Sequence, residues 1–148
     1  MPGSSTVTSP QQLVNTAKAP ILAYNAKDWK ALRSAITDDF IYDEVGTRRK
    51  VQGADEAMNL LKGWAAAIPD SKASFDNALV CGETVVLEVT WRGTHTGALP
   101  TPRGPLAPTG KRIEVRACMA LEVTANRVRV QRHYFDMATL LEQLGQTG

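Results

Sequence analysis

The length, composition and charge of this chain limit the classes of protein to which it can belong. Its 148 residues suit a single domain, and a chain of that length can bury roughly 70% of its unfolded surface in a core. Hydrophobic residues make up 43% of the chain, as in ordinary globular proteins. Since 17 basic residues balance 15 acidic ones, the net charge of +2 argues against a nucleic-acid-binding protein, which would carry a strong basic excess.

The two cysteines and the N-terminal segment exclude further classes. Cys81 and Cys118 have neither the spacing of metal ligands nor that of a disulfide framework. The opening residues, MPGSSTVTSPQQ, lack the apolar core of a signal peptide, and no apolar run reaches the length of a membrane span. We therefore expect a cytoplasmic protein with no membrane partner. Residues 1–9 should form a disordered N-terminus, and residues 10–148 a single domain.

Helical signals dominate the first half of the chain. Ser9 and Gln12 form a capping-box pattern at the start of one helix, and Asp28 can cap a second. Gly53 opens a third helix with an apolar stripe, which Pro69 ends. Between the second and third helices, the sequence predicts a strand at 40–45 and a solvated turn at Arg48-Arg49-Lys50.

After Pro69 the hydrophobic period changes from that of a helix to that of a strand. Further strands are predicted at 72–80, 84–94, 111–123 and 127–135. The side chains expected to face inward from the second of these are Val85, Leu87, Val89 and Trp91. Helices followed by strands indicate an α+β fold, in which three N-terminal helices lie on the concave face of a curved, mostly antiparallel sheet. Such layers would leave a ligand cavity between sheet and helices.

Two segments have a more open interpretation. Residues 96–110 contain four prolines and are long for a hairpin loop, which suggests a lid or an interface arm. Asp136 precedes a short amphipathic helix at 137–144, where an aspartate typically caps the helix.

Three motifs carry a resemblance to a known family. The segments WRGTHTG (91–97), PTGKRIEV (108–115) and VRVQRHYFDMATLLEQLG (128–145) resemble the SnoaL-like polyketide cyclases, over about residues 13–145. These belong to the nuclear-transport-factor-2-like superfamily, with ketosteroid isomerase and limonene epoxide hydrolase. The resemblance implies a cone-shaped α+β barrel, a mostly apolar pocket for a small hydrophobic molecule, no cofactor or metal, and commonly a homodimer.

The catalytic residues of these relatives are only partly matched. The acid–base aspartate of the cyclases corresponds to His133, and their histidine on the preceding strand to Met119. The Asp–Arg–Asp triad of the epoxide hydrolase would need charged residues near Val89 and Trp91, which are apolar. The general-base carboxylate of ketosteroid isomerase aligns near Glu44. The cyclase pair is therefore absent as such, while one isomerase residue has a counterpart.

His133 lies on a strand with two different faces. Simple alternation places Val128, Val130 and Tyr134 on the face opposite His133. Hydrophobicity alone would turn the valine face to the core, whereas the resemblance turns His133 into the pocket. The valine face would then be covered by a second copy of the chain, in a homodimer. An imidazole in the pocket could accept or donate a proton near neutral pH, or it could simply bind and pack.

Glu44 and Tyr42 are the other catalytic candidates. They lie two residues apart on a predicted strand and therefore share a face. If that face lines the cavity, Glu44 could abstract a proton and Tyr42 could donate a hydrogen bond to a substrate oxygen. The alternatives are an exposed turn residue beside Gly46 and a packing tyrosine.

The remaining binding candidates are large or apolar side chains and one histidine. His95 ends a strand between glycines, where it could contact substrate or hold the 96–110 loop. The expected pocket wall consists of Tyr24, Met58, Leu61, Trp64, Trp91, Met119 and Phe135. We expect a cofactor-independent enzyme that moves a proton next to a carbonyl group, in a cyclase or isomerase reaction. A non-catalytic binding module and a water-adding hydrolase based on Glu44 are the alternatives.

Overall fold

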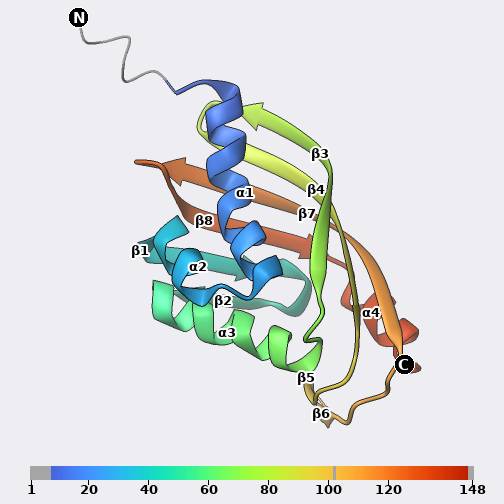
Figure 1. The fold of residues 1–148 in the computed structure, drawn as a ribbon. Coiled ribbons are helices and arrows are strands. Elements are labelled where there is room, and N and C mark those ends of the chain that lie inside the picture. The colour runs from blue at the N-terminus through green and yellow to red at the C-terminus, as the bar shows by residue number, and fades with distance from the viewer. Residues whose placement is uncertain (1–7, 102, 147–148) are drawn as a thin grey trace, which may run out of the picture.

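In the part of the chain that the structure describes, four α-helices pack with an open, curved sheet (Figure 1). The computed structural model describes residues 8–101 and 103–146; the disordered N-terminus expected at 1–9 falls mostly outside this range. The helices are α1 (Pro10–Ala26), α2 (Trp29–Ala35), α3 (Ala54–Ala67) and α4 (Met137–Gln143). The strands are β1 (Ile36–Glu44), β2 (Arg49–Gln52), β3 (Lys72–Cys81), β4 (Thr84–Thr94), β5 (Leu99–Thr101), β6 (Gly104–Leu106), β7 (Arg112–Thr124) and β8 (Arg127–Phe135).

The sheet order is β2-β1-β8-β7-β4-β3, and every neighbouring pair is antiparallel except β1 with β8. Helices α1, α2 and α3 cover one face of this sheet (Figure 1). The predicted α+β class, with three N-terminal helices on a curved and mostly antiparallel sheet, is confirmed. The sheet does not close, because β2 and β3 remain as its two edges.

The predicted helix starts are confirmed by their hydrogen bonds. The Ser9 hydroxyl accepts from the Gln12 backbone N–H at 3.1 Å, and the Gln12 side chain accepts from the Ser9 N–H at 2.9 Å. Asp28 accepts from the Ala31 N–H at 3.0 Å at the start of α2. Gly53 precedes α3 with a φ of +104°, a backbone conformation that favours glycine.

The predicted turn at Arg48-Arg49-Lys50 is wrong for two of its three residues. A 3-10 turn, η2 (Val45–Thr47), and a left-handed Arg48 reverse the chain directly after β1. Arg49 and Lys50 then begin β2, which pairs antiparallel with β1. In this register Arg49 lies opposite Glu44, so a residue assigned to solvent becomes a partner of a buried carboxylate.

The inward faces of strands β4 and β7 follow the predicted alternation of apolar and polar residues. Val85, Leu87 and Val89 are at most 1% exposed, and the alternate residues of β7 from Ile113 to Val123 are all buried. Strands β7 and β8 join through a turn in which Asn126 has a positive φ, a conformation that asparagine tolerates. The sequence therefore predicts the inward and outward faces of β4 and β7 correctly.

Strand β8 departs from simple alternation because it contains a bulge. Glu122 pairs with Val130, but Val123 pairs with Val128, so Arg129 has no partner in the ladder. The extra residue reverses the alternation: Val128, fully buried, and His133 both face inward. The predicted outer stripe of Val128, Val130 and Tyr134 is wrong for Val128, which belongs to the core. Val130 and Tyr134 do lie on the outer face, opposite Glu122 and Cys118, but Val130 is only 7% exposed within one chain.

The 96–110 segment is attached to the end of α3. The backbone N–H groups of Thr96 and Gly97 donate to the carbonyl oxygen of Ala67, at 3.1 and 2.9 Å. A Cβ atom at Gly97 would lie 2.0 Å from the Ala66 carbonyl oxygen, so this close approach requires glycine. Beyond it, β5 and β6 form a small hairpin whose Leu99 is buried. The segment is thus fixed at its first residues.

Asp136 caps α4 as predicted. Its carboxylate accepts from the Ala138 N–H at 3.0 Å and from the Thr139 hydroxyl at 2.8 Å, and these bonds lower its pKa. Asp136→Ala should therefore reduce the midpoint of thermal unfolding by about 3 °C. Asp136→Asn, which keeps an acceptor, should lose less. Equal midpoints for the wild type and Asp136→Ala in a calorimetric scan would refute the capping role.

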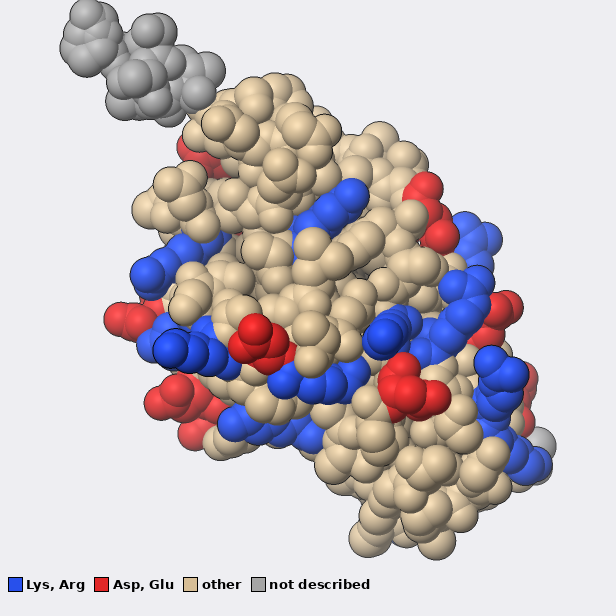
Figure 2. Space-filling model, viewed as in Figure 1, with Lys and Arg blue, Asp and Glu red and all other residues tan. Residues whose placement is uncertain are grey.

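The distribution of surface charges and the lengths of the apolar helices match what the sequence composition predicts. Acidic and basic side chains are interspersed on the face shown in Figure 2. Among the described residues, no helix is both long enough and apolar enough to cross a membrane.

Candidate functional site

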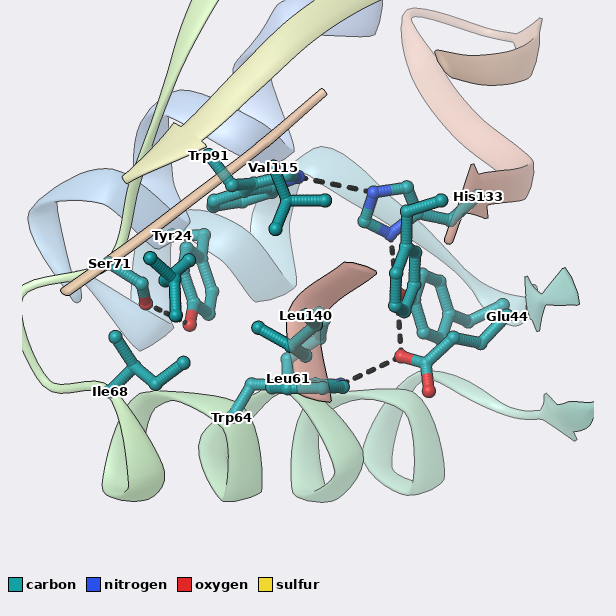
Figure 3. A pocket seen from close by; sticks show the side chains of 13 residues that line it. Tyr24, Glu44, Leu61, Trp64, Ile68, Ser71, Trp91, Val115, His133 and Leu140 are labelled. Atoms are coloured by element: carbon teal, nitrogen blue, oxygen red, sulfur yellow. Dashed lines mark hydrogen bonds between the residues drawn. The ribbon is translucent and has the colours of Figure 1, made fainter. Parts of the chain in front are cut away.

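A cavity of about 70 Å³ lies between the helices and the sheet (Figure 3). This volume has room for roughly five waters. Its walls come from α1, α3, α4, β1, β4, β7 and β8 and are mostly apolar or aromatic. The lining residues are Tyr24, Tyr42, Glu44, Leu61, Trp64, Ile68, Ser71, Trp91, Ile113, Val115, His133, Phe135 and Leu140.

Glu44 is a fully buried carboxylate that accepts five hydrogen bonds. Its Oε2 accepts from the Tyr42 hydroxyl at 3.0 Å and from the Trp64 indole at 2.8 Å. Its Oε1 accepts from the Thr47 hydroxyl at 2.5 Å and from Arg49 Nη2 and Nε at 2.6 and 3.1 Å. Strand β2 therefore supplies the ion pair, and the η2 turn a hydroxyl donor, that make burial of this charge tolerable.

His133 extends this network into the wall beside Trp91. The Trp91 indole donates to Nε2 at 3.2 Å, and Nδ1 lies 2.8 Å from the Tyr42 hydroxyl oxygen. An indole N–H can only donate, so Nε2 must be the unprotonated nitrogen. In the neutral ring Nδ1 then carries the proton and donates to Tyr42, whose own hydroxyl donates to Glu44. The hydrogen bonds thus form one relay, in the order Trp91, His133, Tyr42 and Glu44, with a single direction.

Burial sets the protonation states in this relay. It lowers the pKa of His133 from 6.5 to about 4, although the charge of Glu44 acts in the opposite direction. Burial and the neighbouring Glu44 raise the pKa of Tyr42 well above 10. At neutral pH His133 is therefore an uncharged imidazole and Tyr42 a protonated phenol.

A second polar pair lies across the cavity from the relay (Figure 3). The Tyr24 and Ser71 hydroxyl groups are 2.7 Å apart, and burial raises the pKa of Tyr24 to about 12. Tyr24 therefore remains a hydrogen-bond donor at any physiological pH. The cavity has polar groups at two ends and apolar walls between them.

The structure brings most of the predicted site residues together. His133, Glu44 and Tyr42 all line the cavity and are joined by hydrogen bonds. Five of the expected wall residues also line it: Tyr24, Leu61, Trp64, Trp91 and Phe135. The proposed roles of these residues remain predictions.

Two of the predicted wall residues, and the binding candidate His95, do not line the cavity. Met58 on α3 and Met119 on β7, the cross-strand partner of His133, both pack in the core instead. The His95 ring accepts from the Thr109 N–H at 3.2 Å through Nδ1, which also lies 2.9 Å from the Thr109 hydroxyl. His95 therefore holds the 96–110 loop, the alternative role considered for it.

Several lining residues were not predicted. Ile113 and Val115 could have been found, because they alternate with outward residues along β7. Leu140 belongs to the predicted amphipathic helix α4, whereas Ser71 lies in the loop before β3 and gives no sequence signal of its own. Asp136 does not reach the cavity, since its carboxylate is used at the start of α4. No group of three or more His, Cys, Asp or Glu residues suited to a metal occurs within 8–101 and 103–146.

Comparisons with known proteins agree with this architecture. The family model for SnoaL-like polyketide cyclases matches residues 15–144. No curated protein matches the sequence. The candidate polyketide cyclase IdmH of Streptomyces antibioticus is 23% identical, with a TM-score of 0.77, over 91% of this chain and 99% of its own.

Two other solved structures share the fold with different names. The LEH-like epoxide hydrolase of M. tuberculosis is 19% identical, with a TM-score of 0.70, over 90% of each chain. A protein of Catenulispora acidiphila with a ketosteroid isomerase-like fold, solved with trimethylamine, is 18% identical, with a TM-score of 0.75, over 95% of this chain and 96% of its own. At such identities these structures show the common fold, whereas the family model covers most of the sequence. The chain belongs to the SnoaL-like polyketide cyclase family.

Proposed function

We propose that this protein is a cofactor-independent enzyme of the cyclase or isomerase type, which moves a proton next to a carbonyl group on a small hydrophobic substrate. Family membership supports a cyclase or isomerase role in general terms. The observation that carries the specific proposal is the hydrogen-bonded relay of His133, Tyr42 and Glu44 in the wall of a mostly apolar cavity. Such a cavity would bind an apolar substrate and exclude water from the reacting groups.

The relay allows a proton to leave the substrate without creating a buried imidazolium. His133 Nε2 takes the proton from the carbon next to the carbonyl, and Nδ1 passes its own proton to the Tyr42 oxygen. Tyr42 passes its hydroxyl proton to Glu44 Oε2, so the negative charge moves from Glu44 to the substrate enolate. His133 remains neutral throughout, as its pKa of about 4 favours.

The enolate can then follow one of two courses. Return of the proton to a different carbon shifts a double bond, and attack of the enolate carbon on a second carbonyl closes a ring. The developing oxyanion needs a hydrogen-bond donor, and the indole N–H of Trp91 and the hydroxyl of Tyr24 line the cavity.

Hydrogen–deuterium exchange tests this proposal without knowledge of the natural substrate. Cyclohexanone and 2-tetralone would be incubated with the protein in D₂O, and loss of their α-proton signals followed by NMR. The wild type should accelerate exchange above buffer, and His133→Gln and Glu44→Gln should each reduce the acceleration by about 100-fold or more. Asp136→Ala, outside the cavity, serves as the control variant. Exchange that is no faster than in buffer, or that is equal in the relay variants, would refute the proposal.

A non-catalytic binding module is the second candidate. It is favoured by the fact that both ring nitrogens of His133 already have hydrogen-bond partners. This function predicts that the same ketones bind without any accelerated exchange. Water addition by Glu44 is less well supported, because five donors already occupy the carboxylate oxygens that would have to position the water.

Homodimer formation remains a prediction. Fewer exposed apolar residues on the outer face of β8 support it than simple strand alternation suggested. Of the outer stripe, Tyr134 is still 44% exposed, next to Cys118 on β7. We expect light scattering to give the mass of a dimer at micromolar concentration, and Tyr134→Lys to shift the population towards monomer. A wild-type protein that is monomeric throughout this range would contradict the prediction.

A further inference from the structure

A second, smaller cavity lies directly behind the first. Its volume is about 30 Å³, and it extends between α1, α2 and the sheet. Its own walls include Leu32, Ile36 and Phe40, all nearly fully buried and apolar. The residues that line both cavities, and therefore separate them, are Tyr24, Tyr42, Leu61, Trp91 and His133.

These five shared residues form a partition between the cavities. Among its polar members, Trp91 has the weakest hydrogen bonding. Tyr42 is 1% exposed and has hydrogen bonds on both sides, at 2.8 and 3.0 Å, and Tyr24 is bonded to Ser71 at 2.7 Å. The indole of Trp91 has one hydrogen bond, to His133, and at 3.2 Å it is the longest of the relay. Its ring is only partly buried and stands edge-on to Tyr24, with ring centres 5.4 Å apart.

The same indole occupies the nitrogen that the proposed reaction needs. As long as Trp91 donates to His133 Nε2, the imidazole has no free lone pair for a substrate proton. A movement of Trp91 away from His133 would therefore do two things at once. It would uncover Nε2, and it would remove the ring that separates the two cavities.

We propose that Trp91 is a movable partition that determines substrate size. A substrate displaces its indole from His133 and extends from the first cavity into the second. This inference rests on the proposed function for the role of Nε2. The class of substrate that fits is a flat, hydrophobic ketone larger than a single ring, with its acidic carbon at His133 and an apolar ring among Leu32, Ile36 and Phe40. A smaller ketone displaces the indole less far and occupies only the first cavity.

The test compares a one-ring and a two-ring ketone, cyclohexanone and 2-tetralone, as binding probes. The wild-type indole N–H signals are followed by NMR, and the Trp91 signal is identified by its loss in Trp91→Phe. We expect 2-tetralone to shift this signal more than cyclohexanone does. Trp91→Ala, which joins the cavities, should bind 2-tetralone about tenfold more tightly, with cyclohexanone affected much less.

Trp64→Ala provides the matched control. It removes an indole that lines the first cavity but not the second. The affinities for the two probes should therefore change by the same factor. Thermal unfolding would confirm that each variant is folded, and Trp91→Leu would replace Trp91→Ala if the latter is not.

Three outcomes would overturn the partition. In the first, 2-tetralone binds but leaves the Trp91 signal unchanged. In the second, Trp91→Ala gains no preference for the larger probe. In the third, 2-tetralone binds to no variant, since a joined cavity should admit it whether or not a reaction follows. Failure of α-proton exchange alone would instead refute the proposed function, because these binding measurements do not depend on turnover.

Discussion

Acidification from pH 6.5 to pH 4 should lower the free energy of unfolding by about 3 kcal/mol through His133 alone. The pKa of this histidine is about 4 in the folded protein and 6.5 in the unfolded chain. Between these values the unfolded chain binds the proton and the folded protein does not, so protonation favours unfolding. The contribution is fully present above pH 6.5 and is lost as the pH falls towards 4.

Urea unfolding at several pH values, with His133→Gln as the comparison, isolates this effect. The variant has no titrating group at position 133, so the difference in stability between it and the wild type should shrink by about 3 kcal/mol over the window. Carboxylates with lowered pKa values, such as Asp70 and Glu122, begin to lose their contributions at the acid end of this window, but they are common to both proteins, so their loss cancels in the difference. Parallel pH profiles for the two proteins would show that His133 titrates normally.

Replacement of Glu44 by alanine should cost about 3 kcal/mol of stability, or roughly 10 °C in the midpoint of thermal unfolding. The substitution removes the acceptor of both the Tyr42 hydroxyl and the Trp64 indole. It also removes the partner of Arg49, but that side chain is 44% exposed and can turn to water. The expected loss is therefore at the lower end of the range for a broken buried ion pair.

Two further variants separate the contributions at this site. Glu44→Gln keeps the shape and one acceptor oxygen, and should be less destabilising than Glu44→Ala. Arg49→Ala leaves the buried carboxylate without its counter-charge, and should cost at least as much as Glu44→Ala although the bonds from Tyr42 and Trp64 remain. A change within about 0.5 kcal/mol for Glu44→Ala would mean that the carboxylate contributes nothing to the fold.

The helices and long strands could be predicted because local chemistry determines them. Caps at Ser9, Asp28 and Asp136 and the alternation along β4 and β7 all depend on residues close in sequence. Strand β2 could not be predicted in this way. Its four residues, RKVQ, lie at a sheet edge and are mostly exposed, so they show no hydrophobic alternation. The partner of Glu44 was missed together with that strand.

The candidate site was predicted in its members but not in its connections. Strand parity and the family resemblance selected His133, Glu44 and Tyr42, all of which line the cavity. The donors Trp64 and Trp91 were expected only as apolar wall, because their partners are 20 and 42 residues distant in the sequence. Met119 was misplaced for a related reason: cross-strand pairing puts His133 beside it, and the chain sequence does not show which of the two reaches the cavity.

The bulge at Arg129 sets the alternation of β8 from one end of the strand to the other. Val128 and His133 both face inward although they are five residues apart, an odd spacing that a regular strand would place on opposite faces. Loss of Arg129 would restore continuous pairing with β7 and leave both residues inward, whereas loss of the bulge without loss of a residue would turn one of them outward. Among related chains, therefore, a β8 that is one residue shorter can still present the same imidazole to the cavity. The histidine is identified by its pairing with β7 and not by its distance from Val128.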